Sequence, residues 1–267
     1  MNIRTVLSRT PVLIVLAAAA AALAAGAASG ARSAGPLTFC SDMTYPPMES
    51  LVGGKPTGAD IDIGAAVAKK LGLTASFRNI GFDAIIPALL NKKCDAVISA
   101  MTNTPPRAKQ VDFANYVTVG MSLMVKQGNP SKITGLGSLS GKAAAVEAAT
   151  TEKAALDTLN KKLSAAGKKT VAIKSFPADT NAAAALLTGK VDAYFADATP
   201  VLYYIKKTGG KFEATGAQID SAPEGIATRK GDPVGPKIAA AVKALYADGS
   251  MAKILATWGI SAFALKS

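Results

Sequence analysis

The 267-residue sequence contains no histidine. This absence excludes Ser-His-Asp and Cys-His nucleophile systems, zinc sites that use histidine, and acid–base catalysis by an imidazole. Hydrophobic residues make up 49% of the chain and charged residues 18%, which is typical of a globular protein. We therefore expect a folded chain, long enough for one large or two medium domains, that holds no metal and no cofactor.

Long apolar runs are also scarce, and the longest lies at the N-terminus. Arg4 and Arg9 precede an apolar run over 12–25, and small residues dominate 26–34. This run is shorter than the roughly 20 residues of a membrane-spanning helix, and the three-part pattern is typical of a secretory signal peptide. Phe39 before Cys40 argues against a lipid anchor. We predict that 1–34 is removed and that the soluble mature protein is periplasmic, or extracellular where no outer membrane exists.

Acidic residues are fewer than basic ones, so the net charge is +12. Residues 1–34 contain three arginines and no acidic residue, which leaves +9 for the rest of the chain. A basic balance can indicate a nucleic-acid partner. Here the lysines are scattered singly or in pairs, without a basic run or an interleaved aromatic platform. We expect a solvated basic surface and no nucleic-acid partner.

Only two cysteines are present, Cys40 and Cys94. Export to an oxidising compartment suggests a disulfide. However, Cys40 lies near the end of a strand expected over 37–41, and Cys94 precedes a strand expected over 95–100. On neighbouring parallel strands this offset corresponds to roughly 13 Å, beyond the ~7 Å Cα limit for a bridge. We therefore predict two buried free thiols.

Short apolar runs alternate with helical segments along the chain, which is typical of an α/β fold with parallel strands. Two such series follow each other. A short strand expected over 225–228 and helices expected over 234–247 and 250–258 come at the end. We predict a two-lobed protein in which each lobe is a small, mainly parallel sheet flanked by helices. A ligand cleft is expected between the lobes, at the carboxyl ends of the strands.

The predicted lobes are not continuous in sequence. The first comprises 36–120 plus 223–267, and the second comprises 121–222. The chain would therefore cross between them near 118–121 and again near 221–223. A double connection of this kind permits hinge closure about one axis.

Five short motifs follow one another in the mature chain. They are 41–49 (SDMTYPPME), 58–63 (GADIDI), 81–89 (GFDAIIPAL), 94–102 (CDAVISAMT) and 104–107 (TPPR) followed by 111–113 (VDF). In this order and spacing the sequence resembles the periplasmic polar amino-acid-binding proteins of ABC import systems, which include lysine/arginine/ornithine-, histidine- and glutamine-binding members. The resemblance covers about 37–258. It implies a two-lobed periplasmic-binding-protein fold.

The resemblance also implies a set of ligand contacts. Arg107 matches the arginine that clamps the ligand's α-carboxylate, a role suited to a planar fork of donors. The Ala100 carbonyl and Thr102 match contacts to the α-ammonium and α-carboxylate, and Asp197 matches the carboxylate that pairs with the ammonium. Thr150 and Thr151 match a helix N-terminus that receives the carboxylate; helix capping alone is the competing interpretation for these threonines and for Asp197.

Four further positions match the pocket for the ligand side chain. Tyr45 and Phe82 correspond to two aromatic walls, which suit a cation. Asp42 is expected at the bottom, and Glu147 occupies a position from which the second lobe touches the side chain. Two buried like charges require a cation between them, so we favour a basic amino acid. One departure is Ala149, which stands where the family usually has glycine.

The sequence therefore predicts a monomeric binding protein that captures a free L-amino acid and delivers it to an ABC transporter membrane permease. It predicts no catalytic residues. The main alternative is an enzyme on the same scaffold, such as a cyclohexadienyl-type dehydratase or a cell-wall lyase, with Glu147 or Asp42 as general acid.

Overall fold

The computed structural model of the protein describes residues 35–265. The predicted signal peptide, 1–34, lies outside this range. Within the described residues, no helix is long and apolar enough to cross a bilayer.

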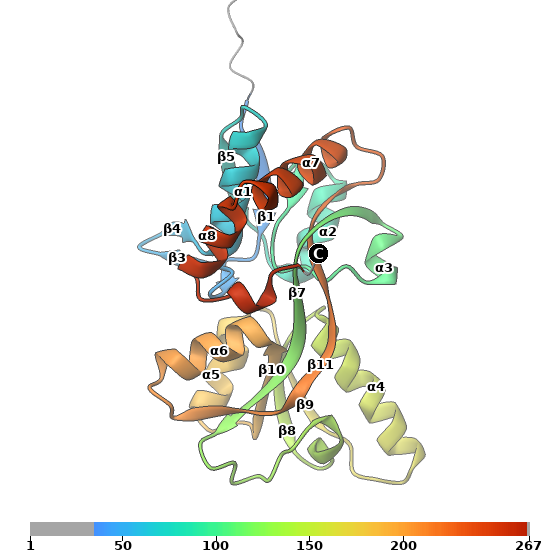
Figure 1. The fold of residues 1–267 in the computed structure, drawn as a ribbon. Coiled ribbons are helices and arrows are strands. Elements are labelled where there is room, and N and C mark those ends of the chain that lie inside the picture. Colours follow the sequence, from blue (N-terminus) through green and yellow to red (C-terminus); the bar gives the residue numbers. More distant parts are fainter. Residues whose placement is uncertain (1–34, 266–267) are drawn as a thin grey trace, which may run out of the picture. The chain divides into compact units, whose positions relative to one another are not determined.

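One eight-stranded sheet organises the fold, in the order β5-β1-β6-β11-β7-β10-β8-β9 (Figure 1). β1 pairs in parallel with β5 and β6, and β8 pairs in parallel with β9 and β10. β7 and β11 are antiparallel to each other and join these two parallel groups. The eight strands are β1 (Leu37–Ser41), β5 (Ala75–Asn79), β6 (Ala96–Val97), β7 (Val111–Lys126), β8 (Ala143–Glu147), β9 (Ala172–Phe176), β10 (Ala193–Asp197) and β11 (Phe212–Arg229).

Helices cover both parallel groups, which confirms the predicted α/β fold. α1, α2, α7 and α8 pack on or beside the β5-β1-β6 group and the adjoining parts of β7 and β11, whereas α4, α5 and α6 pack around the β10-β8-β9 group. The helices are α1 (Ala59–Lys70), α2 (Phe82–Leu90), α3 (Pro105–Ala108), α4 (Thr151–Ala165), α5 (Asp179–Leu187), α6 (Ala198–Lys207), α7 (Val234–Ala247) and α8 (Ser250–Thr257). Their apolar faces form continuous cores with the sheet.

A small second sheet follows β1 and was not predicted from the sequence. It consists of β2 (Thr44–Tyr45), β3 (Glu49–Val52) and β4 (Lys55–Thr57), in the order β2-β3-β4. Gly58 ends it with φ 146°, and a Cβ there would lie 2.1 Å from the Met48 carbonyl oxygen. This close backbone approach brings the small sheet against the start of α1.

β11 is much longer than expected. The sequence predicted only a short strand over 225–228, but β11 spans Phe212–Arg229 beside β7. Its pairing is irregular between Thr215 and Ile219 and between Ile219 and Ala222, and most residues of that stretch are not buried. A strand without a buried face has no period-two alternation of apolar residues, so the sequence carried no signal for it.

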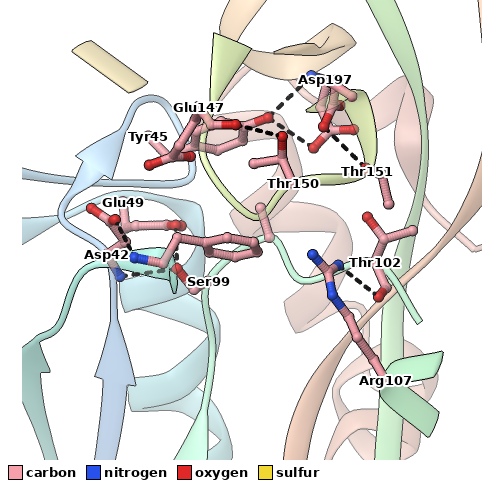
Figure 2. A pocket seen from close by; sticks show the side chains of 13 residues that line it. Asp42, Tyr45, Glu49, Ser99, Thr102, Arg107, Glu147, Thr150, Thr151 and Asp197 are labelled. Atoms are coloured by element: carbon pink, nitrogen blue, oxygen red, sulfur yellow. Dashed lines mark hydrogen bonds between the residues drawn. The ribbon is translucent and has the colours of Figure 1, made fainter. Parts of the chain in front are cut away.

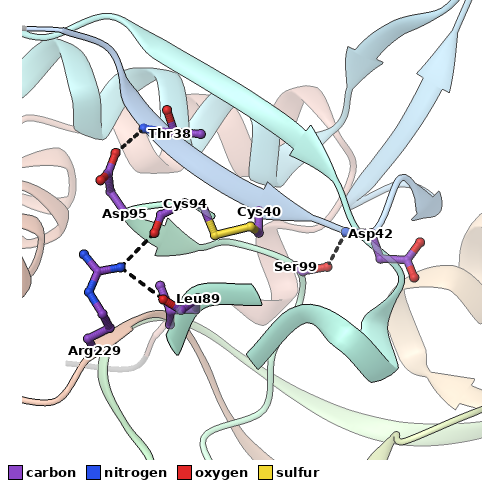
Figure 3. The surroundings of a disulfide bond; sticks show 8 residues. All are labelled: Thr38, Cys40, Asp42, Leu89, Cys94, Asp95, Ser99 and Arg229. Carbon is purple, nitrogen blue, oxygen red and sulfur yellow. Dashed lines mark hydrogen bonds between the residues drawn. A yellow bond between two sulfur atoms is a disulfide. The ribbon is translucent and has the colours of Figure 1, made fainter. Parts of the chain in front are cut away.

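Cys40 and Cys94 form a disulfide, with their Cα atoms 5.7 Å apart, so the prediction of two free thiols is wrong (Figure 3). That prediction assumed an extended chain before the strand expected over 95–100. Residues 91–95 instead form turns and bends, which place Cys94 against β1 even though Val97 is the residue that pairs with Cys40. Arg229 Nη1 donates a 2.8 Å hydrogen bond to the Cys94 carbonyl and helps to fix this turn.

Candidate functional site

A pocket of about 290 Å³, counted with its opening to solvent, lies where the carboxyl ends of β1, β6, β8 and β10 converge (Figure 2). All ten residues that the sequence singled out line it: Asp42, Tyr45, Phe82, Ala100, Thr102, Arg107, Glu147, Thr150, Thr151 and Asp197. Three residues that the sequence reasoning missed also line it: Glu49, Ser99 and Glu152.

Arg107 on α3 is the only cationic side chain in the pocket lining of residues 35–265. Its Nη1 donates to the Thr102 carbonyl at 3.0 Å, and its Nη2 donates to the Ala149 carbonyl at 3.1 Å. The guanidinium carbon lies 5.1 Å from the centre of the Phe82 ring, within cation–π range. Burial lowers the pKa of Arg107, and the nearby Glu152 carboxylate opposes that shift. A guanidinium stays charged under such conditions, so Arg107 presents a fixed positive charge to the pocket.

Asp197 ends β10 and is 6% exposed. The Tyr45 hydroxyl donates to Asp197 Oδ2 at 2.9 Å, and the Asp197 N–H donates to the same hydroxyl oxygen at 3.0 Å. Burial, followed by the charge of Glu152, raises the pKa of Asp197 well above its usual range. A cation beside this carboxyl would therefore stabilise its charged form.

Asp42 and Glu147 line the same pocket and are 2% and 4% exposed. Asp42 Oδ2 accepts the Phe82 N–H at 2.8 Å, at the start of α2. Glu147 Oε1 receives no hydrogen bond from an N–H or hydroxyl group among the described residues, and the Glu147 carboxyl group meets that of Asp42. Burial, followed by the charges of Asp179 and Asp42, raises the pKa of Glu147 to about 10. This end of the pocket thus holds two carboxyl groups that need either a proton or a cation.

The backbone at Ala100 adopts a left-handed conformation, with φ 41°. Its N–H donates to Asp60 Oδ2 at 2.7 Å, and the Tyr116 hydroxyl donates to the same oxygen at 2.8 Å. Asp60 is fully buried in the first turn of α1. A non-glycine residue at positive φ stores strain that its surroundings must offset; Asp60 supplies such a contact at the pocket wall.

The N-terminus of α4 forms the opposite wall. The Thr150 hydroxyl accepts the Lys153 N–H at 3.2 Å and donates to the Glu147 carbonyl at 2.9 Å, so Thr150 caps α4, a role compatible with the ligand contact predicted for it. Ala149 has φ 62°, in the region that favours glycine, which explains why glycine was expected there. Helix amides at this position favour an anion.

The three missed residues left different traces in the sequence. Ser99 Oγ donates to Glu49 Oε1 at 2.8 Å and accepts the Asp42 N–H at 2.9 Å. Glu49 lies in the motif at 41–49 and Ser99 in the motif at 94–102, so both could have been found from the sequence. Glu152 could not, because an acidic residue in the first turn of a helix is ordinary.

Comparison with known proteins agrees with this geometry. The family model of bacterial extracellular solute-binding proteins, family 3, matches residues 37–261. ABC transporter arginine-binding protein 1 of Escherichia coli is 32% identical over 237 residues, covering 86% of this chain and 93% of that protein. ABC transporter glutamine-binding protein GlnH of Bacillus subtilis is 31% identical over 211 residues, covering 77% and 73%.

Solved structures give the same result. An ancestral arginine-binding protein bound to arginine superposes with a TM-score of 0.77 at 36% identity, covering 85% of this chain and 99% of that one. The matched segment contains every pocket residue. The chain therefore belongs to the bacterial extracellular solute-binding proteins, family 3.

Proposed function

We propose that this protein captures a free basic L-amino acid, arginine, lysine or ornithine, and delivers it to the membrane permease of an ABC transporter. The observation that carries the proposal is the charge distribution along the pocket. Arg107 and Asp197 line one part of it, whereas the buried pair Asp42 and Glu147 supplies two further carboxyl groups. A zwitterion with a cationic side chain has one charge for each of these features.

The relatives alone do not decide between ligands, because their names include both arginine and glutamine. The pocket favours the cation. A neutral amide beside Asp42 and Glu147 would leave two buried carboxyl groups without a positive partner, which is costly when either is ionised. A guanidinium or ammonium between them stabilises both charges and can donate to Glu147 Oε1.

Capture by closure is part of the proposal. We infer two lobes, 36–120 plus 223–267 and 121–222, that rotate about the paired strands β7 and β11 near 118–121 and 221–223. Arg107 and Ala149, and also Tyr45 and Asp197, would form their hydrogen bonds across the cleft between these lobes. A ligand that binds more tightly to the closed form shifts the equilibrium towards it by that difference in affinity. Export as a monomer to the periplasm, or to the outer face of the cell membrane, completes the proposal.

Calorimetric titration against a panel of amino acids tests the ligand class. Arginine, lysine or ornithine is expected to bind at least about tenfold more tightly than glutamine and glutamate. Tighter binding of glutamine or glutamate would refute the proposed class. The dehydratase alternative has less support, because the matching family model and the similar proteins are named as solute-binding proteins.

A further inference from the structure

Glu152 is a pocket carboxylate that the zwitterion contacts described above leave without a role. It is the second residue of α4, lines the pocket and is 2% exposed. Its Oε2 accepts a 3.0 Å hydrogen bond from the Thr151 hydroxyl. Its Oε1 is buried and receives no hydrogen bond from an N–H or hydroxyl group among residues 35–265, and its carboxyl group meets that of Asp197. Two buried carboxyl groups therefore face each other at the wall of the binding site, and both can ionise only when a cation lies beside them.

Glu152 lies close to both Arg107 and Asp197. Among neighbouring charges, that of Glu152 raises the pKa of Arg107 most, and it also raises the pKa of Asp197 most. Its carboxylate also interacts with its own backbone N–H, at the N-terminus of α4. A ligand α-carboxylate is expected beside the same two elements, Arg107 and the helix N-terminus. The protein thus places a carboxylate of its own where the carboxylate of an amino acid would bind.

The charges of the whole pocket lead in the same direction. Five carboxyl side chains and one guanidinium line it: Asp42, Glu49, Glu147, Glu152 and Asp197 against Arg107. An α-carboxylate would add a sixth carboxyl group, which would have to bind Arg107 near Glu152 against like-charge repulsion. A ligand with two cationic ends and no carboxylate avoids this repulsion.

We propose that Glu152 determines specificity at this end of the site, and that the pocket takes α-decarboxylated basic ligands, guanidino-amines and diamines, as well as basic amino acids. The inference rests on the proposed function in one respect, namely that this pocket is the ligand site. The amine of such a ligand pairs with Asp197 and with the facing carboxyl group of Glu152. Its other cation pairs with Asp42 and Glu147.

Titration calorimetry with matched ligands tests the proposal. Arginine is compared with agmatine, and lysine with cadaverine, in the wild-type protein, in Glu152→Gln and in the control Asp157→Asn. Asp157 lies on the same helix, outside the pocket, and its side chain is 48% exposed. In the wild type, agmatine is expected to bind within about tenfold of arginine. In Glu152→Gln the preference shifts towards arginine by at least about tenfold, whereas Asp157→Asn leaves the ratio unchanged.

The outcomes separate the two proposals. Binding of arginine with agmatine more than tenfold weaker in the wild type would overturn the role of Glu152 and leave the proposed function in place. An unchanged ratio in a folded Glu152→Gln variant would do the same. Binding of agmatine without arginine would support the role of Glu152 and refute the amino-acid proposal. Failure of all four ligands to bind would overturn both, and the wild-type ratio decides the matter even if Glu152→Gln does not fold.

Discussion

Tyr45 and Asp197, which are 152 positions apart in the chain, exchange two hydrogen bonds through a single phenolic oxygen. The hydroxyl donates to the Asp197 carboxylate and accepts the Asp197 N–H. Tyr45 ends β2 in the small three-stranded sheet, and Asp197 ends β10 in the eight-stranded sheet. These two bonds hold Tyr45, a wall of the pocket, and Asp197, the proposed partner of the ligand ammonium, in place relative to each other.

Removing that hydroxyl tests the coupling. Tyr45→Phe leaves the Asp197 N–H and one carboxylate oxygen without their partner, and it keeps the aromatic ring in the pocket. An unsatisfied buried group costs about 1–3 kcal/mol, so arginine affinity is expected to fall about tenfold to a hundredfold by calorimetry. Tyr203→Phe is the control, because the Tyr203 hydroxyl only accepts an exposed hydrogen bond from Lys207. Equal affinities for both variants would show that the Tyr45–Asp197 contact does not support binding.

The buried carboxyl groups predict how the stability of the ligand-free protein depends on pH. Burial is the first cause that raises the pKa of Asp60 to about 6, of Asp179 to about 8 and of Glu147 to about 10. At any pH between the ordinary pKa of such a group and its raised pKa, the folded state binds more protons than the unfolded state. The free energy of unfolding should therefore be highest at the acidic end of this window and fall as pH rises from about 4 to about 10.

Glu147→Gln isolates one contribution to this pH dependence. The amide cannot ionise, so the decline in the free energy of unfolding between pH 5 and pH 9 should become shallower by up to about 1.4 kcal/mol per pH unit. The same variant should bind arginine more weakly, because it lacks a carboxylate for the ligand cation. Urea unfolding at several pH values measures the first effect, with Glu213→Gln, outside the pocket lining, as control. A slope that matches the wild type would contradict the burial of an ionisable Glu147.

Gly58 provides a test of how the small sheet is held against α1. An added Cβ would lie 2.1 Å from the Met48 carbonyl oxygen and 2.6 Å from its carbon. Because these are backbone atoms, Gly58→Ala should lower the free energy of unfolding by more than about 2 kcal/mol. Gly54 also has positive φ but has nothing within 4 Å of its Cβ position, so Gly54→Ala should cost only about 1 kcal/mol. Similar losses in both variants, measured by urea unfolding, would exclude the steric contact.

Much of the fold could be predicted because local pattern and tertiary structure agree. The helix expected over 234–247 is α7, and the strand expected over 37–41 is β1. β11 was largely missed because its middle has no buried face, and β2, β3 and β4 because they are only two to four residues long. The disulfide was missed for a different reason: a turn before β6 cannot be distinguished from an extended approach by counting residues.

The candidate site was more accessible to sequence reasoning than the register of the sheet. The resemblance to a family supplied the residues themselves, such as Asp42, Glu147 and Asp197, and the common edge at which parallel strands end supplied the place of the ligand. The same resemblance supplied Arg107 and Phe82. Glu152 escaped both arguments, since its burial depends on the packing of α4 against the pocket, which no local pattern records.

The most direct test of the cationic pocket is a comparison of L-arginine with L-citrulline by titration calorimetry at neutral pH. The two ligands have nearly the same shape, but citrulline carries a neutral urea group in place of the guanidinium. If Asp42 and Glu147 bind a cation, arginine should bind at least about a hundredfold more tightly. Citrulline binding as tightly as arginine, or more tightly, would contradict the assignment.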